Sequence, residues 1–237
     1  MTHTPEILLF DIDGTLMHSG GAGLRSMDRI FQERHGVPQA FNDFDFQGKM
    51  DPAIFRETLR RFQIQVPDED AEIQALIRGY EAYIAEEMPK SAKARMMPGV
   101  RDLLGRLQAL PISIGLLTGN VIGGAQAKLK HFDLWKYFPY GAFGSDHEER
   151  AALVPIALRR AATHLQRVVP PGPHVYIIGD TDRDIACAKA NGCTAVGVGT
   201  LNYSAAELSR LGADLVFDDF SDTETVIKTL GVNHGRT

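Results

Sequence analysis

Acidic residues stand at two places in the chain where a short apolar run gives way to small and polar residues. Residues 11–15 read Asp-Ile-Asp-Gly-Thr after the apolar run 7–10, and residues 179–184 read Gly-Asp-Thr-Asp-Arg-Asp after the run 175–178. A third segment, Thr118-Gly119-Asn120, follows the apolar run 112–117. Carboxylates and hydroxyls are ligands for hard cations, and glycine turns let backbone N–H groups approach anionic oxygens. These three segments are therefore the candidates for chemistry.

Four carboxylates brought to one place would repel each other, and this repulsion predicts a cation. The four are Asp11, Asp13, Asp180 and Asp184. Two like charges 4 Å apart repel by about 4 kcal/mol at an effective dielectric constant near 20. A hard divalent cation would offset this, and Mg²⁺ typically takes one or two carboxylates together with a substrate phosphate. Alternatively, one carboxyl group stays protonated because its neighbours repel its charge. Both can hold at once.

The elements that must position these residues follow from the spacing of apolar side chains. Five short runs have the pattern of strands buried on both faces: 7–10, 112–117, 175–178, 194–198 and, more weakly, 214–217. Helical spacing occurs between them at 100–110, 151–168 and 184–190. The alternation predicts an α/β fold with a doubly wound, mostly parallel sheet. In such a sheet ligands bind beyond the carboxyl ends of the strands, where the three polar segments fall.

One long segment interrupts this alternation. From about residue 17 to residue 94 the apolar residues recur at helical spacing without a strong strand pattern, and helices are expected at 23–34, 52–62 and 68–87. We therefore expect a helical domain at 17–94, inserted into a core formed by 1–16 and 95–237. The active site is expected in the crevice between the two.

Composition and charge exclude several classes of protein. Of the 237 residues, 44% are hydrophobic, enough for a substantial core, so global disorder is excluded. Lys and Arg number 25 against 30 Asp and Glu, a net charge of −5 without a basic stripe, so no nucleic-acid partner is expected. No apolar stretch approaches the roughly 20 residues that cross a bilayer, and the first residues lack the basic region of a secretory signal. We expect a cytoplasmic protein without a membrane partner, either a monomer or a homodimer.

In these motifs and their order the chain resembles the haloacid dehalogenase superfamily. Its members share Asp-x-Asp-Gly-Thr at a strand end, a Thr or Ser after a second strand, and a later acidic Gly-Asp pair. The resemblance covers nearly the whole chain, and the insert looks like the small helical cap of phosphoglycolate-phosphatase-like members. It implies a Rossmann-like core and a Mg²⁺-dependent phosphatase that hydrolyses a small phosphorylated metabolite, 2-phosphoglycolate being the candidate, through an aspartyl-phosphate.

The resemblance also implies a role for each motif residue. Asp11 would be the nucleophile, and Asp13 would protonate the leaving oxygen and then activate water. The metal would be held by Asp11, the backbone carbonyl of Asp13 and Asp180, with Asp184 supporting the site from behind. The segment Thr118-Gly119-Asn120 would bind phosphoryl oxygens. An acid at position 13 favours phosphate transfer over dehalogenation, because an alkoxide leaving group needs a proton and a halide does not.

One residue of the superfamily pattern is absent, a lysine that precedes the acidic motif. In the corresponding interval Arg150 is the only cation of the segment 143–150, and we hypothesise that its guanidinium replaces the lysine beside the nucleophile and the phosphate. Lys128 and Lys130, on the helix after Thr118, are the competitors. In the insert, Lys49 stands in a turn that opens a helix and is expected to contact the substrate.

Two other functions remain open from the sequence. A β-phosphoglucomutase-like phosphotransferase would form the same aspartyl-phosphate and return the phosphoryl group to a sugar, which requires a second anion clamp in the cap. A non-catalytic phosphate-binding or interaction module is favoured only by the missing lysine. The intact pair Asp11 and Asp13 argues against this second alternative.

Overall fold

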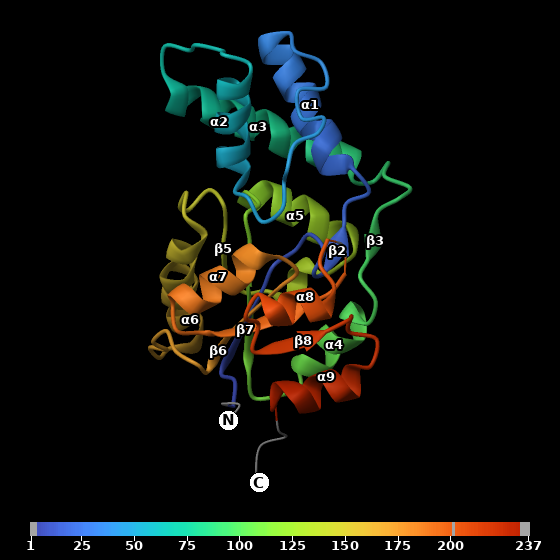
Figure 1. Ribbon diagram of the computed structural model, residues 1–237, viewed down its shortest axis with the longest axis vertical. Coiled ribbons are helices and arrows are strands. Elements are labelled where there is room, and N and C mark those ends of the chain that lie inside the picture. Colours follow the sequence, from blue (N-terminus) through green and yellow to red (C-terminus); the bar gives the residue numbers. More distant parts are fainter. Residues whose placement is uncertain (1–3, 201, 233–237) are drawn as a thin grey trace.

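A six-stranded sheet forms the centre of the molecule in the computed structural model, which describes residues 4–200 and 202–232 (Figure 1). The strand order is β5-β4-β1-β6-β7-β8, and the strand pairings within this sheet are parallel. The strands are β1 (Ile7–Phe10), β4 (Ser113–Leu117), β5 (Gly141–Ala142), β6 (Val175–Gly179), β7 (Thr194–Val198) and β8 (Leu215–Phe217). The predicted parallel sheet is thus confirmed.

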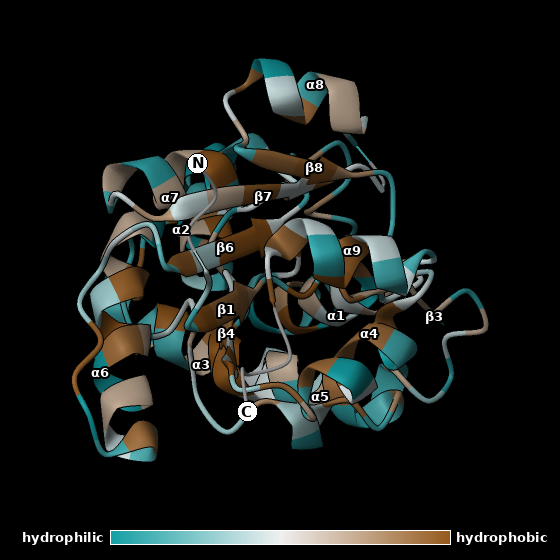
Figure 2. Cartoon of the chain, turned by 90° about the horizontal axis from the view of Figure 1, so that it is seen from below, coloured by the Kyte–Doolittle hydropathy of each residue, from teal (hydrophilic) through white to brown (hydrophobic). Residues whose placement is uncertain are grey.

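Helices cover both faces of this sheet, because its strands are apolar on both sides (Figure 2). In β1 the side chains of Ile7 and Leu9 pack in one apolar cluster with α6 and α7, whereas Leu8 and Phe10 pack in another with α4, α5 and α9. These core helices are α4 (Val100–Leu107), α5 (Ile122–His131), α6 (Leu153–Leu165), α7 (Asp182–Ala190), α8 (Ala205–Arg210) and α9 (Thr223–Leu230). This arrangement confirms the predicted doubly wound α/β fold.

Two helices begin or end at other residues than predicted, because capping residues set their ends. The helix expected at 184–190 begins at Asp182, because Thr181 is its N-cap and forms a capping box with Asp184. The helix expected at 151–168 begins at Leu153 and ends at Leu165, since Gln166 adopts a left-handed conformation. Helices α8 and α9 and strand β5 were not predicted, and β5 has only two residues, too few for a readable pattern.

The segment predicted as a helical insert contains α1 (Ala22–His35), α2 (Asp51–Arg61) and α3 (Glu69–Glu87), which lie together above the sheet in Figure 1. Aromatic side chains form their common core, with Phe41 in edge-to-face contact with Phe31 and with Phe55. An antiparallel pairing of β2 (Met17–His18) with β3 (Arg95–Met96) joins the places where the chain leaves and re-enters the core. The domain bounds 17 and 94 stay predictions.

Among the described helices, none combines the length and the apolar character needed to cross a membrane.

Candidate active site

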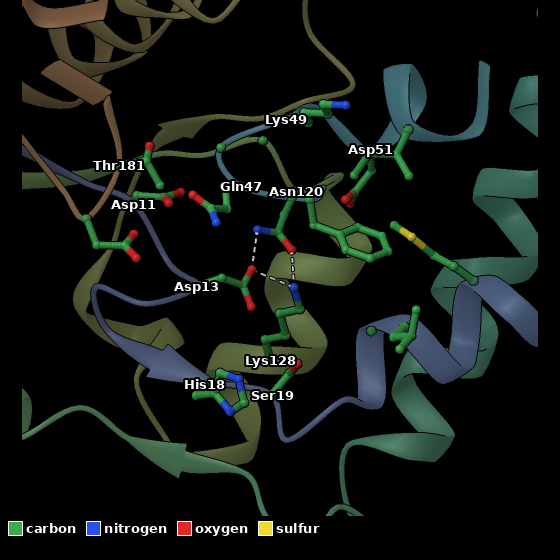
Figure 3. Close-up of a pocket in the computed structure, with 18 of the residues that line it drawn as sticks. Asp11, Asp13, His18, Ser19, Gln47, Lys49, Asp51, Asn120, Lys128 and Thr181 are labelled. Carbon is green, nitrogen blue, oxygen red and sulfur yellow. Dashed lines mark hydrogen bonds and ion pairs between the residues drawn. The ribbon is translucent and has the colours of Figure 1, made fainter. Parts of the chain in front are cut away.

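The carboxyl ends of β1, β4 and β6 meet at one edge of the sheet and carry the three polar segments. Parallel pairing places Phe10 of β1 opposite both Leu116 and Ile178, so the residues that follow emerge side by side. A cavity of about 260 Å³ lies at this edge, between the core and the insert (Figure 3). Its lining includes the predicted site residues Asp11, Asp13, Lys49, Gly119, Asn120, Arg150 and Asp180, and the competitor Lys128. The structure therefore brings together residues that lie up to 169 positions apart in the sequence, 180 − 11.

Three buried carboxylates form a cluster beside the cavity. One oxygen from each of Asp11, Asp180 and Asp184 lies within 4.8 Å of the others. Gly14 makes this approach possible, because it has a φ of +80° and a Cβ at this position would lie 2.0 Å from Oδ2 of Asp180. The first and the last acidic motifs are thus in direct contact.

The electrostatics of this cluster fit a hard divalent cation. Burial, together with the charges of Asp184 and Asp11, raises the pKa of Asp180 to about 9. Burial also raises the pKa of Asp11 to about 6, although the Arg150 guanidinium opposes the shift. Carboxylates with raised pKa values are stabilised in their charged form by an added cation, and all the donors are oxygens, as Mg²⁺ requires. The residues present therefore fit a metal of this kind, with Asp11 and Asp180 as the side chains that would hold it.

Asp184 has both carboxylate oxygens engaged with protein groups. Its Oδ1 lies 2.5 Å from Nη2 of Arg150, and its Oδ2 accepts hydrogen bonds from the Thr181 backbone N–H at 3.1 Å and the Thr181 hydroxyl at 2.7 Å. These contacts suit a residue that orients the groups around it. They agree with the supporting role that the sequence suggests, which stays a proposal.

Arg150 lies beside the predicted nucleophile. Its Nη2 is 3.2 Å from Oδ1 of Asp11 and also contacts Asp184, and its side chain is 7% exposed. Burial works to lower the pKa of Arg150, but the charges of Asp184 and Asp11 raise it well above its usual range. A short 3-10 turn, Arg150–Ala152, fixes the residue at the start of α6. Arg150 therefore occupies a place from which it could act as the missing lysine.

The two competing lysines lie elsewhere. Lys128 is buried and its Nζ is 2.6 Å from Oδ2 of Asp13, whereas Lys130 is exposed. From the sequence alone Lys128 is only a competitor of Arg150, and its partnership with Asp13 was missed. One sequence signal could have indicated that Lys128 is buried. It lies three and four positions from Ala125 and Gly124 and next to Leu129, and these residues together form the buried face of α5.

The loop after β4 joins the core to the insert. The Gly119 carbonyl accepts a hydrogen bond from the Asp51 N–H at 2.9 Å, and the Asp51 carboxylate accepts one from the Val121 N–H at 2.8 Å. A Cβ at Gly119 would lie 2.1 Å from the Lys49 carbonyl oxygen, so glycine permits this close approach. The Asn120 amide Nδ2 donates to the Thr118 hydroxyl at 2.9 Å. Thr118 also donates a hydrogen bond to Asp11, which places its hydroxyl beside the predicted nucleophile.

Lys49 lines the cavity but is bound to the insert. Its Nζ lies 2.7 Å from Oε2 of Glu57 and 4.6 Å from the centre of the Phe44 ring. In Figure 3 its side chain points away from Asp11 and Asp13. The predicted contact of Lys49 with a substrate stays a prediction, since it requires the ammonium group to leave Glu57.

Comparison with known proteins agrees with this geometry. Residues 8–198 match the family model described as haloacid dehalogenase-like hydrolase. The chain belongs to this family. Members of the family generally use a divalent metal, and the buried carboxylate cluster of this hydrolase could hold one.

Relatives of this haloacid dehalogenase-like hydrolase include proteins named as phosphatases. A phosphoglycolate phosphatase of Salmonella typhi is 28% identical over 248 residues, covering 95% of this chain and 92% of the relative. A probable phosphatase, IndB, of Dickeya dadantii (strain 3937) is 24% identical over 230 residues, covering 91% and 90%. The solved structure of a hydrolase from Pseudomonas syringae has a TM-score of 0.70 at 20% identity, covering 95% and 98%, and shows the same fold. The predicted family, fold and enzyme class, a phosphoric monoester hydrolase, are confirmed.

Asp51 of the hydrolase, which sequence reasoning missed, should make stability depend on pH. Burial raises its pKa to about 7, against the opposing effects of Lys128 and the Val121 hydrogen bond. An unfolded Asp titrates near pH 4, so between about pH 4 and pH 7 the folded chain keeps a proton that the unfolded chain releases. Stability due to this group is therefore lost as the pH rises through that interval. We expect Asp51→Asn to stabilise the protein by up to about 3 kcal/mol more at pH 8 than at pH 5.

Urea unfolding of the parent and the variant at both pH values measures this difference. The amide oxygen introduced by Asp51→Asn can still accept the Val121 hydrogen bond, so the comparison isolates the charge. The control Asp70→Asn replaces an exposed carboxylate instead and should show no comparable difference. An Asp51→Asn effect equal at the two pH values would contradict the prediction.

Proposed function

We propose that this hydrolase is a Mg²⁺-dependent phosphatase that cleaves a small, phosphoglycolate-like phosphate monoester through an aspartyl-phosphate. The observation that carries the proposal is the buried contact of Asp11 with Arg150, in a carboxylate cluster with Asp180 and beside a cavity that Asp13 also lines. The Salmonella relative named phosphoglycolate phosphatase supports the substrate class. A cytoplasmic location, a small phosphorylated metabolite as the only partner, and a monomer or homodimer belong to the same proposal.

Asp11 and Asp180, together with the backbone carbonyl of Asp13, would hold the metal. When bound, Mg²⁺ would neutralise phosphate charge that otherwise repels an anionic nucleophile. Arg150 adds a second positive charge from the protein itself, since it contacts Asp11 at Oδ1 and leaves Oδ2 of that carboxylate for attack on phosphorus.

The residues of the chain supply the remaining steps. As the bond between Asp11 and phosphorus forms and the bond from phosphorus to the leaving oxygen breaks, Asp13 gives its proton to that oxygen. Asp13 then takes a proton from the water that attacks the phosphoenzyme, which releases inorganic phosphate and restores Asp11. The Thr118 hydroxyl and the backbone N–H groups of Gly119 and Asn120 would bind the phosphoryl oxygens during both displacements.

The cavity accommodates a small phosphate ester. Its volume of about 260 Å³ has room for a phosphate and a small organic group while the insert stays in contact with the loop after β4. Opening and closing of this contact would admit the ester and release the products, and closure would exclude bulk water during the attack.

Release of inorganic phosphate from a panel of phosphorylated small metabolites, 2-phosphoglycolate among them, tests this function. With Mg²⁺ we expect hydrolysis, and with excess EDTA a fall of at least about 100-fold that added Mg²⁺ reverses. Mg²⁺ should also raise the midpoint of thermal unfolding, because it binds only the folded chain. Turnover that is indifferent to EDTA would contradict the metal requirement.

The two alternative functions give different results in the same assay. A phosphotransferase would convert a hexose phosphate to an isomer without free phosphate, but the cationic candidate in the insert, Lys49, is paired with Glu57. A non-catalytic module would bind phosphate in the presence of metal and turn over no ester. The position of Arg150 beside Asp11 weighs against that module, because the missing lysine was its only support.

A further inference from the structure

Three polar side chains beside the cavity, those of Asp13, Asn120 and Lys128, are joined to one another by hydrogen bonds (Figure 3). Nζ of Lys128 lies 2.6 Å from Oδ2 of Asp13 and 2.5 Å from Oδ1 of Asn120. Nδ2 of Asn120 donates to the same Oδ2 of Asp13 at 2.9 Å. Each of the three side chains therefore contacts the other two.

Burial of Lys128 explains why it keeps both partners. The side chain of Lys128 is 6% exposed, whereas that of Asp13 is 40% exposed and lines the cavity. An ammonium group that is taken out of water is stable only with a carboxylate or other acceptors beside it, so Lys128 is tied to Asp13 and Asn120.

The hydrogen bonds distinguish the two oxygens of Asp13. Lys128 and Asn120 both donate to Oδ2, and none of the described residues donates to Oδ1. An oxygen that accepts from two N–H donors has no room for a proton of its own without losing one of them. Oδ1 is therefore the oxygen of Asp13 that is left for the cavity.

We propose that Lys128 is a positioning residue of the hydrolysis reaction, which holds Oδ2 of Asp13 together with Asn120 and so directs Oδ1 to the leaving-group oxygen. This inference rests on the proposed function. The proton moves from Oδ1 to the leaving oxygen as the bond between phosphorus and that oxygen breaks and the bond to Asp11 forms. Asp13, now a carboxylate, later accepts a proton from the attacking water through the same oxygen.

The role predicts a dependence on the leaving group that a purely structural role would not produce. An alkyl ester leaves as an alkoxide and needs the proton, whereas acetyl phosphate leaves as acetate and does not. We compare kcat/KM, which reports formation of the phosphoenzyme, because its later hydrolysis is common to both substrates. For Lys128→Met we expect kcat/KM on an alkyl phosphate of the panel to fall by about 100-fold and kcat/KM on acetyl phosphate to change by less than about 5-fold. Asn120→Ala, which removes the other donor to Oδ2, should likewise lower kcat/KM more on the alkyl phosphate than on acetyl phosphate.

Three comparisons complete the experiment. Asp13→Asn should show the same contrast between the two substrates, and Lys128→Met combined with Asp13→Asn should be no slower than Asp13→Asn alone, because both changes act on one proton transfer. Lys130→Met, an exposed change on the same helix, should leave both rates at the parental level. Circular dichroism with thermal unfolding checks that each variant is folded.

Equal losses of kcat/KM on both substrates, or an unchanged kcat/KM on the alkyl ester, would overturn the role of Lys128 while leaving the proposed phosphatase intact. A folded parent protein that hydrolyses neither ester in Mg²⁺ would overturn the proposed function, and the role of Lys128 with it. The two failures are therefore distinguishable by the activity of the parent.

Discussion

Replacement of Arg150 by methionine is expected to abolish hydrolysis and, without added metal, to lower the free energy of unfolding by about 3–5 kcal/mol. The guanidinium lies 3.2 Å from Asp11 and 2.5 Å from Asp184, and all three side chains are buried. Its removal leaves two carboxylates close together in the interior without their cation, and desolvation then acts on both without compensation. Urea unfolding in the presence of EDTA measures the loss of stability.

Two further variants show whether the loss has this cause. Adding Asp184→Asn to Arg150→Met removes one of the two unpaired carboxylates and should recover part of the stability, whereas an unrelated packing defect would not respond. Lys130→Ala, at the exposed competitor, should change neither stability nor turnover. Arg150→Met should also lose acetyl phosphate hydrolysis, which separates its role from that of Lys128. If Arg150→Met kept parental turnover while Lys128→Ala or Lys130→Ala destroyed it, the assignment of Arg150 would be wrong.

Asp11→Asn is expected to lower the rate of phosphate release by at least about 10,000-fold, because an amide cannot form the aspartyl-phosphate. The variant should nevertheless fold at least as stably as the parent at pH 7. Burial raises the pKa of Asp11 to about 6, so the parent loses stability between about pH 4 and pH 6 as this carboxyl ionises, and asparagine avoids that loss. Inorganic phosphate release and thermal unfolding, measured on the same sample, separate catalysis from folding.

Trapping of the phosphoenzyme adds a direct readout. Acid quenching during turnover followed by mass spectrometry should detect a phosphorylated peptide containing Asp11 in the parent and none in Asp11→Asn. The exposed acidic residue Asp182 provides the matched control, and Asp182→Asn should keep both the phosphopeptide and the turnover. Undiminished activity of Asp11→Asn would refute the covalent mechanism.

Local pattern was enough to predict most of the fold. A strand buried on both faces must be apolar throughout, so the runs that became β1, β4, β6 and β7 were visible without knowledge of their partners. Parallel pairing of such strands sends their carboxyl ends to one edge, and this placed the segments of Asp11, Thr118 and Asp180 together. The two-residue strands β2, β3 and β5 could not be seen, because they exist only through their pairing with distant strands.

The sequence alone determined which carboxylates belong to the site, because the acidic motifs come directly after strands that the apolar pattern predicts. Which cation meets which carboxylate was decided by the tertiary structure alone. Lys128 and Lys130 lie two positions apart and hence about 200° apart around α5, so packing of that helix buries one of them against Asp13 and leaves the other in solvent. Arg150 reaches Asp11 because its side chain, which starts from the turn before α6, also contacts Leu117 of β4 and Asp184 of α7, elements that no local pattern relates to each other. Electrostatic pairing of this kind depends on distances between segments far apart in the chain, and only the packed molecule sets those distances.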